Sequence, residues 1–281
     1  MSHGVAWLHM RKPKPSSISN ERVATNLLAG ANVVVTRPTA TAAVLKRRII
    51  ALGGNPLSLP GVVLKIVEAD SALTNQLLAA RQSDIVIFVS PAAVRFTFAL
   101  RPQLRFSRQT VILAVGGATA EALARQRIQN VRQPLLRHDS EGLLALPELT
   151  AVRGKHVSLI GAPGGRGLLT QTLRRRRAKV EVIHVYRRNA PVYSRRQLTK
   201  LELATAPLIT ILSSAEVLLN LRTILPLHLY ARLAAGELVV SSQRLATIAR
   251  NHLFSRTHIA ASAAPADLLH TACDALSRHR L

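Results

Sequence analysis

The sequence predicts an α/β protein whose parallel sheets are covered by helices on both faces. Short runs of β-branched and other apolar residues recur along the chain, as in Ile85-Val-Ile-Phe-Val89. Each run ends in Ser, Thr, Gly or Pro, and a helical pattern follows it. Runs that are apolar at every position are typical of strands buried on both faces. Their alternation with helices indicates parallel sheets.

The same unit recurs from residue 32 onward. In the first helix Leu45, Ile49 and Leu52 share one face, and Gly53-Gly54 ends it. A further strand is expected at 180–186. In chain order the predicted strand and helix pairs are 33–36 with 41–52, 85–89 with 92–100, 111–115 with 119–127, 157–160 with 167–176, 208–212 with 216–221 and 238–240 with 244–250.

Composition excludes several classes of protein. The 281 residues are 48% apolar and 19% charged, which disfavours long-range disorder. No apolar stretch reaches the roughly 18 residues that a membrane span needs. Cys273 is the lone cysteine, which excludes a disulfide framework and a CxxC metal site. We therefore expect a reducing compartment, the cytoplasm, and no membrane partner.

The charge is unusual, with 38 Lys and Arg against 14 Asp and Glu, a net charge of +24. Such an excess favours an anionic partner, either a nucleic acid or a polyanionic small molecule. Aromatic residues make up only 3% of the chain, so platforms for base stacking are hard to build, and we disfavour nucleic acid. Arg174-Arg-Arg-Arg177 fits a solvated helix end better than a nucleic-acid patch.

The predicted strand tips are candidates for anion binding. In parallel α/β folds, ligands bind where strands end and helices begin, because free N–H groups and the positive end of the helix dipole gather there. Ser90, Thr119, Ser213 and Ser214 place hydroxyls at these tips. Helix capping alone accounts for any one of them. The Gly-rich loop 161–167 fits neither GxGxxG nor the P-loop motif.

The first 31 residues differ from the rest. They include Arg11-Lys-Pro-Lys-Pro-Ser-Ser17, have no acidic residue before Glu21, and lack the apolar core of a secretory signal. A transit peptide remains an alternative, but no clear amphipathic helix is present. We interpret residues 1–31 as a mobile extension.

From residue 32 to the C-terminus, an ordered series of short motifs resembles the uroporphyrinogen-III synthase family, and its proteobacterial branch most. The motifs that carry the resemblance are Val34-Val-Thr-Arg-Pro38, Leu52-Gly-Gly-Asn-Pro56, Ile87-Phe-Val-Ser-Pro-Ala-Ala-Val94, Ala114-Val-Gly-Gly-Ala-Thr-Ala120, Ser140-Glu-Gly-Leu-Leu144, Gly154-Lys155, Gly164-Gly-Arg166, Val185-Tyr-Arg187, Ser213-Ser-Ala-Glu216 and Val239-Val-Ser-Ser242.

The resemblance implies two flavodoxin-like, doubly wound parallel-sheet domains, with one domain inserted in the other and a two-stranded linker between them. The outer domain is expected at 32–61 and 192–281, and the inserted one at 64–189. The crossings then fall near Pro60-Gly61 and Arg188-Asn-Ala-Pro191. Pro and Gly make both segments suitable linkers.

The implied reaction closes hydroxymethylbilane into uroporphyrinogen III, with loss of water and inversion of ring D. The substrate carries eight carboxylates, which fits the basic chain. The resemblance implies no metal or organic cofactor and suggests a handover of substrate from hydroxymethylbilane synthase. We expect a monomer. The alternatives are a basic nucleic-acid-associated protein and a non-catalytic tetrapyrrole-binding relative.

The resemblance also implies site residues at an interdomain cleft. Tyr186 matches the family's tyrosine near the cleft, a candidate to hydrogen-bond or protonate the leaving hydroxyl. Its alternative role is that of a strand-end anchor for the linker. Departures at Gly161-Ala162 and Arg177 put individual contacts in doubt. The residues expected to bind substrate are Arg37, Ser90, Gly116, Thr119, Arg166, Ser213 and Ser214.

Overall fold

The computed structural model describes residues 26–135, 137, 139–164, 167–205 and 207–279. These residues divide into two compact units. Unit 1 comprises residues 26–62 and 191–279, and unit 2 comprises residues 63–190. The chain therefore passes from unit 1 to unit 2 after Val62 and returns before Pro191.

The described part of unit 1 contains a five-stranded parallel sheet in the order β11-β10-β9-β1-β2. The three central strands are buried at every position, as their unbroken apolar runs predict. β2 lies at the edge and contains Pro56, which an edge strand tolerates. The strands are β1 Asn32–Val35, β2 Asn55–Ser58, β9 Leu208–Leu212, β10 Glu237–Val240 and β11 Thr257–Ile259.

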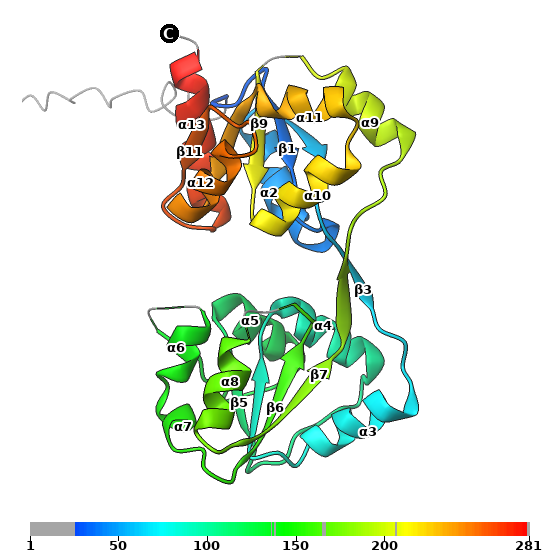
Figure 1. Ribbon diagram of the computed structural model, residues 1–281, viewed down its shortest axis with the longest axis vertical. Helices are drawn as coiled ribbons and strands as arrows, with labels where there is room; N and C mark the ends of the chain where they lie inside the picture. The colour runs from blue at the N-terminus through cyan, green and yellow to red at the C-terminus, as the bar shows by residue number, and fades with distance from the viewer. Residues whose placement is uncertain (1–25, 136, 138, 165–166, 206, 280–281) are drawn as a thin grey trace, which may run out of the picture. The chain divides into compact units, whose positions relative to one another are not determined.

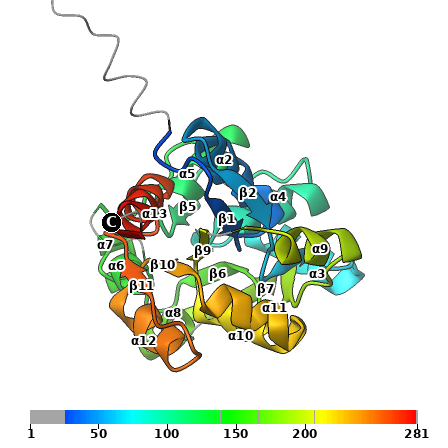
Figure 2. The same ribbon diagram turned by 90° about the horizontal axis from the view of Figure 1, so that it is seen from above.

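Helices cover both faces of this sheet. α2 and α13 share one face and enclose a core that includes Leu45, Ile49 and Cys273, whereas α9 to α12 lie on the other face, as the view from above shows (Figure 2). The helices are α2 Thr39–Ala51, α9 Arg195–Glu202, α10 Ala215–Ile224, α11 Leu227–Ala234, α12 Gln243–Arg250 and α13 Pro265–His279.

In the described part of unit 2, a four-stranded parallel sheet has the order β5-β4-β6-β7 (Figure 1). Helices α3, α4 and α5 bury one face and α6, α7 and α8 the other. The elements are α3 Ser71–Ala80, β4 Ile85–Phe88, α4 Pro91–Leu100, β5 Val111–Ala114, α5 Gly117–Arg125, α6 Ser140–Leu144, α7 Pro147–Thr150, β6 His156–Gly161, α8 Leu168–Arg175 and β7 Lys179–His184.

A two-stranded antiparallel ribbon forms the ends of unit 2 where the chain enters and leaves it. β3 (Val63–Ile66) pairs with β8 (Tyr186–Asn189), so that Ile66 lies opposite Tyr186. The expectation of one strand over 180–186 is wrong, because β7 ends at His184 and β8 begins at Tyr186. The break is hidden in the sequence because no Gly, Pro, Asn or Asp lies between His184 and Tyr186.

The expected N-terminal extension is too long at its C-terminal end. Residues 26–30 form a turn, and the Leu28 N–H donates to the carbonyl of Leu52 at 2.8 Å. Leu28 and Ala31 are fully buried in the core of unit 1. Residues 26–31 therefore belong to the folded unit, and the rest of the expected extension lies outside the described residues. In the described parts of the chain, no helix is both long and apolar enough to span a bilayer.

Candidate functional site

The carboxyl ends of the parallel strands carry the helix starts that the sequence predicts. Ser90 follows β4 and caps α4, its Oγ accepting from the Ala93 N–H at 3.0 Å. Ser214 follows β9 and caps α10 through the Val217 N–H at 3.3 Å. Capping orients each hydroxyl at the positive end of a helix. Each sheet therefore presents hydroxyls and helix N-termini at its carboxyl edge.

Ser90 and Tyr186, which are 96 positions apart in sequence, meet at this edge of unit 2. The Oγ of Ser90 and the phenol oxygen of Tyr186 lie 3.1 Å apart. The tyrosine ring stacks on the Phe96 ring, with the two centroids 5.3 Å apart. The guanidinium of Arg95 lies over the Phe96 ring, 4.5 Å from its centroid. Tyr186 is only 5% exposed. The ring is thus part of the core, while its hydroxyl is held against a strand tip.

Gly116 and Thr119 lie at the start of α5, after the neighbouring strand β5. Gly116 is buried and extended, and its carbonyl accepts from the Thr119 N–H at 2.9 Å. Thr119 is 1% exposed, so its side chain packs inside the unit. The structure therefore places both residues at the expected strand tip, with Thr119 beneath the surface.

In unit 1, Arg37 and the serine pair follow adjacent strands, since β1 pairs with β9. Arg37 donates from Nη2 to the carbonyl of Ala263, in the turn before α13. Its Nε is buried and has no hydrogen-bond partner within the described residues. Burial lowers the pKa of Arg37 below its usual value. A partly desolvated guanidinium with an unused donor favours an anionic ligand.

A cavity of about 470 Å³ lies at the carboxyl edge of unit 2. Its walls come from the ends of β4 to β7 and from the starts of α6 and α8. The described lining includes Asp139, Thr170 and His184 but no lysine or arginine. His184 was missed in the sequence because no motif marks it; its one signal is its position at the end of a predicted strand.

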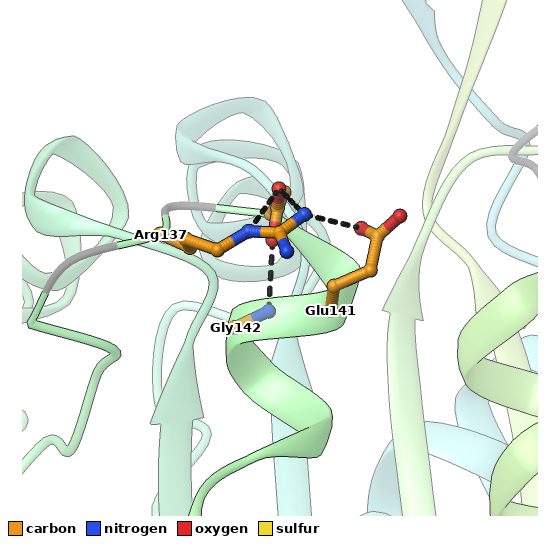
Figure 3. A network of polar contacts seen from close by, with 4 residues as sticks. Arg137, Glu141 and Gly142 are labelled. Atoms are coloured by element: carbon orange, nitrogen blue, oxygen red, sulfur yellow. Dashed lines mark hydrogen bonds and ion pairs between the residues drawn. The ribbon is translucent and has the colours of Figure 1, made fainter.

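An ion-pair network holds the start of α6 beside this cavity (Figure 3). Arg137 Nη2 donates to Asp139 Oδ2 at 2.9 Å and lies 3.9 Å from a carboxylate oxygen of Glu141. The hydrogen bond to Asp139 and its charge raise the pKa of Arg137. Asp139 in turn caps α6, its Oδ1 accepting from the Gly142 N–H at 2.8 Å. The arginine thereby orients the carboxylate that caps the helix.

Arg166, expected to bind substrate, lies outside the described residues. Within the described parts of the chain, no group of three His, Cys, Asp or Glu side chains is placed to hold a metal ion.

Comparison with known proteins decides the family. The family model described as HEM4, uroporphyrinogen-III synthase HemD, matches residues 43–270. The uroporphyrinogen-III synthases of Salmonella typhimurium and Escherichia coli are each 31% identical over 222 residues, covering 78% of this chain and 90% of theirs. The chain belongs to the uroporphyrinogen-III synthase family. It is therefore an enzyme of the lyase class, in haem biosynthesis.

Solved structures of the family share the fold. A mutant uroporphyrinogen III synthase from the extremely thermophilic bacterium Thermus thermophilus has a TM-score of 0.58 at 18% identity, covering 88% of this chain and 99% of its own. Uroporphyrinogen-III synthetase from Helicobacter pylori has a TM-score of 0.55 at 13% identity, with the same coverage. At such identities the likeness concerns the fold alone, an α/β fold with parallel sheets.

Proposed function

We propose that this member of the uroporphyrinogen-III synthase family closes hydroxymethylbilane to uroporphyrinogen III, and that its chemical step depends on Tyr186. The observation that carries the proposal is the 3.1 Å contact between Tyr186 and Ser90 at the carboxyl edge of unit 2. That edge is where parallel α/β sheets bind their ligands. The substrate loses its terminal hydroxyl as water, and a positioned phenol can assist this departure as a hydrogen-bond donor or acid.

The hydrogen bonds around Ser90 support a direction for the proton. Ser90 Oγ accepts from the Ala93 N–H, so its single hydrogen is available for the phenol oxygen of Tyr186. In this arrangement the phenol keeps its own hydrogen for another acceptor. We assign that acceptor as the departing hydroxyl of the substrate. The serine then serves as a positioning residue for the tyrosine.

The substrate's carboxylates are the second part of the proposal. In unit 1, the unused Nε of Arg37 and the hydroxyls of Ser213 and Ser214 are suited to bind carboxylates, together with the N-terminus of α10. In unit 2, Gly116 and Thr119 place the N-terminus of α5 at the edge. Binding the flexible tetrapyrrole in one closing geometry would supply much of the rate, because orientation lowers the entropic part of the barrier.

The finer fold assignment belongs to the same proposal. Numbered within each unit, the strand orders are 2-1-3-4-5 in unit 1 and 2-1-3-4 in unit 2, leaving out β3 and β8. This is the order of flavodoxin-like doubly wound folds, with unit 2 inserted in unit 1. We further propose that the protein is a monomer, acts in the cytoplasm without a cofactor, and receives its substrate from hydroxymethylbilane synthase.

Incubation of the purified protein with freshly generated hydroxymethylbilane tests the reaction. Spontaneous closure of the substrate yields the symmetric isomer I. Enzymatic closure is therefore shown by isomer III forming faster in the presence of the protein than isomer I forms in its absence. We expect isomer III to dominate the product. Binding of the substrate without acceleration would reject the proposal in favour of a non-catalytic tetrapyrrole-binding relative.

A further inference from the structure

The excess positive charge of unit 2 lies at the edge of its sheet opposite the site described above. Arginines and lysines follow the C-termini of α3, α4, α5 and α8 and precede β5, β6 and β7, all of which meet at the amino edge of the strands. Arg176, at the end of α8, is left out because its Nη1 donates to the carbonyls of Leu144 and Leu149. The others are exposed except Arg101, which is half-buried. These amino-edge cations are Arg81, Arg101, Arg105, Arg108, Arg125, Arg127, Arg153, Lys155, Arg174, Arg175, Arg177 and Lys179.

Carboxylates do not neutralise this surface. Among the described residues, the ion pair that reaches it joins Arg125 to Glu121 at 3.3 Å, one helical turn apart and largely in solvent. Asp84 lies nearby as well, and its Oδ2 accepts from the backbone N–H of His156 at 2.8 Å. These two carboxylates offset only a small part of the charge of the twelve cations. The amino edge therefore keeps a concentrated positive field, which attracts polyanions and raises their association rate.

Helix dipoles account for only part of the cluster. Cations in the last turn of a helix, such as Arg174 and Arg175 in α8, are stabilised by its negative end. Arg105 and Arg108 lie in the loop before β5, and Lys155 and Lys179 lie at the starts of β6 and β7. These four lie outside the last turn of the helices in the described parts of the chain. An anionic partner that binds along the whole amino edge would account both for the cations at helix ends and for those in the loops and strand starts.

The same edge has two adjoining hollows that are lined in part by arginine side chains. They share Leu78 and Arg81 and have volumes of about 380 and 530 Å³. Arg101 lines the first, and its buried Nε has no hydrogen-bond partner among the described residues. Arg105 lines the second together with Asp84, Ser107 and Thr110. Arg105 Nη1 donates to the carbonyl of Leu104 and the Thr110 hydroxyl to that of Ser83, each at 2.8 Å, so the other guanidinium N–H groups are the ones left for a ligand. Guanidinium donors around a hollow are suited to a phosphate group.

We propose that the amino edge of unit 2 binds the phosphate backbone of a nucleic-acid duplex. The partner is assigned as a duplex because backbone contacts need cations and not aromatic platforms, and the chain is only 3% aromatic. The scarcity of aromatic residues, which disfavours binding of single strands, thus does not exclude this partner. Arginine predominates over lysine here, and its planar fork matches phosphate oxygens in pairs. The reaction is assigned to the other edge, so binding is independent of catalysis.

Fluorescence anisotropy of a short labelled DNA duplex with the full-length protein tests the proposal. The edge variant carries Arg105→Gln, Arg108→Gln and Arg177→Gln, and the control carries Arg47→Gln, Arg250→Gln and Arg278→Gln in unit 1. All six side chains are exposed, and both variants lose the same charge. Titrations between about 50 and 200 mM salt give the affinity and its salt slope.

We expect the edge variant to bind about tenfold more weakly at the lowest salt, with a slope smaller by about 0.9 for each phosphate contact removed. The affinity of the control variant for the duplex should stay within about twofold of that of the parent protein. Both variants should have the Tm of the parent protein and its rate of isomer III formation. Absence of duplex binding by the parent protein, or an equal loss in both variants, would overturn the proposal. Displacement of the duplex by polyglutamate at equal charge would also overturn it, since it indicates an acidic protein partner.

Discussion

At Arg37, a single residue combines structural contacts with a donor that the described structure leaves unused. Its Nη2 holds the turn before α13 through the carbonyl of Ala263, while the buried Nε has no partner among the described residues. Such a group costs stability unless it gains a ligand, because a buried unsatisfied donor has lost its water. We therefore propose that Arg37 binds substrate and does not serve folding alone.

Replacement of Arg37 by Gln tests this role. We expect KM to rise about tenfold, because the variant loses one charge-assisted hydrogen bond to the substrate, and kcat to change little. Stability should fall by about 1 kcal/mol through the lost bond to Ala263. Arg47→Gln, on the exposed side of α2, is the control and should change neither quantity. An unchanged KM with a large drop in Tm would assign Arg37 a purely structural role.

Gly142 is a second residue whose identity the structure explains. A Cβ at this position would lie 1.9 Å from the carbonyl oxygen of Arg137, so the loop before α6 would have to shift. We expect Gly142→Ala to lower the free energy of unfolding by about 1–3 kcal/mol, as overpacking does. Gly117→Ala is the control, because its Cβ would meet nothing closer than 3.8 Å.

Chemical denaturation of both glycine variants measures the difference. Gly117 is the first residue of α5, where Ala is the better helix former, so its variant should match or exceed the parent protein by up to about 1 kcal/mol. Equal stability of the two variants would show that the close approach to Arg137 is not a constraint.

At the scale of elements, α4 links a helix cap to the proposed chemistry. Ser90→Ala removes both the cap of α4 and the contact to Tyr186. Ser194→Ala removes the cap of α9, which is part of a capping box with Gln197. Each change should cost about 1 kcal/mol of stability. Only Ser90→Ala should lower kcat, by about tenfold, because it alone removes the contact that positions the hydroxyl of Tyr186. A matching fall in kcat for Ser194→Ala would attribute the effect to stability.

The sequence predicts these elements unevenly, for physical reasons. β4 and β5 are predicted to within one residue, because unbroken apolar runs end at Ser90-Pro91 and Gly116-Gly117. β2 is not recognisable, since an edge strand with Pro56 needs neither an apolar run nor every backbone donor. The exposed ribbon strand β3 lacks the same signal.

The sequence predicts that hydroxyl residues such as Ser90 and Ser214 lie at strand tips, but not how the candidate residues are arranged. Ser90 and Tyr186 were both singled out, yet nothing local indicates that they touch, because β8 reaches the tip of β4 only through the tertiary fold. The burial of Thr119 is likewise a property of packing against the sheet. Spacing along the chain predicts which strand tips carry hydroxyls, and the topology decides which of them meet.

At the scale of the whole molecule, two buried groups, Tyr230 and Cys273, and the half-buried Tyr193 make stability depend on alkaline pH. Burial raises the pKa of Tyr193 and Tyr230, and burial together with Asp274 raises that of Cys273. The folded protein therefore keeps protons that the unfolded chain releases. This contribution is complete below the ordinary values, 9.0 for the thiol and 10.0 for the phenols, and is lost as pH rises through the raised values.

We therefore expect Tm to fall as pH rises above about 9, and the fall to begin at higher pH in Cys273→Ala. Differential scanning fluorimetry across this range, at constant ionic strength, measures both curves. A Tm that stays constant or rises above about pH 9 would contradict the assigned directions.

The distribution of charge separates two properties of the molecule. In unit 2, cations gather at the amino edge, whereas the described lining of the carboxyl-edge cavity has none. Recognition of a polycarboxylate substrate at that edge would then depend on helix N-termini and hydroxyls more than on net charge. The excess of +24 is thus only partly explained by the reaction.

The measurement that tests the central claim most directly is the steady-state kinetics of Tyr186→Phe beside Tyr193→Phe. Each variant loses one phenol hydroxyl, bonded to Ser90 in the first case and to the Pro60 carbonyl in the second. We predict that Tyr186→Phe lowers kcat about 10²-fold, leaves KM nearly unchanged and still yields isomer III, while Tyr193→Phe retains kcat. Full kcat in Tyr186→Phe would contradict the account and make Tyr186 a structural anchor at the start of β8.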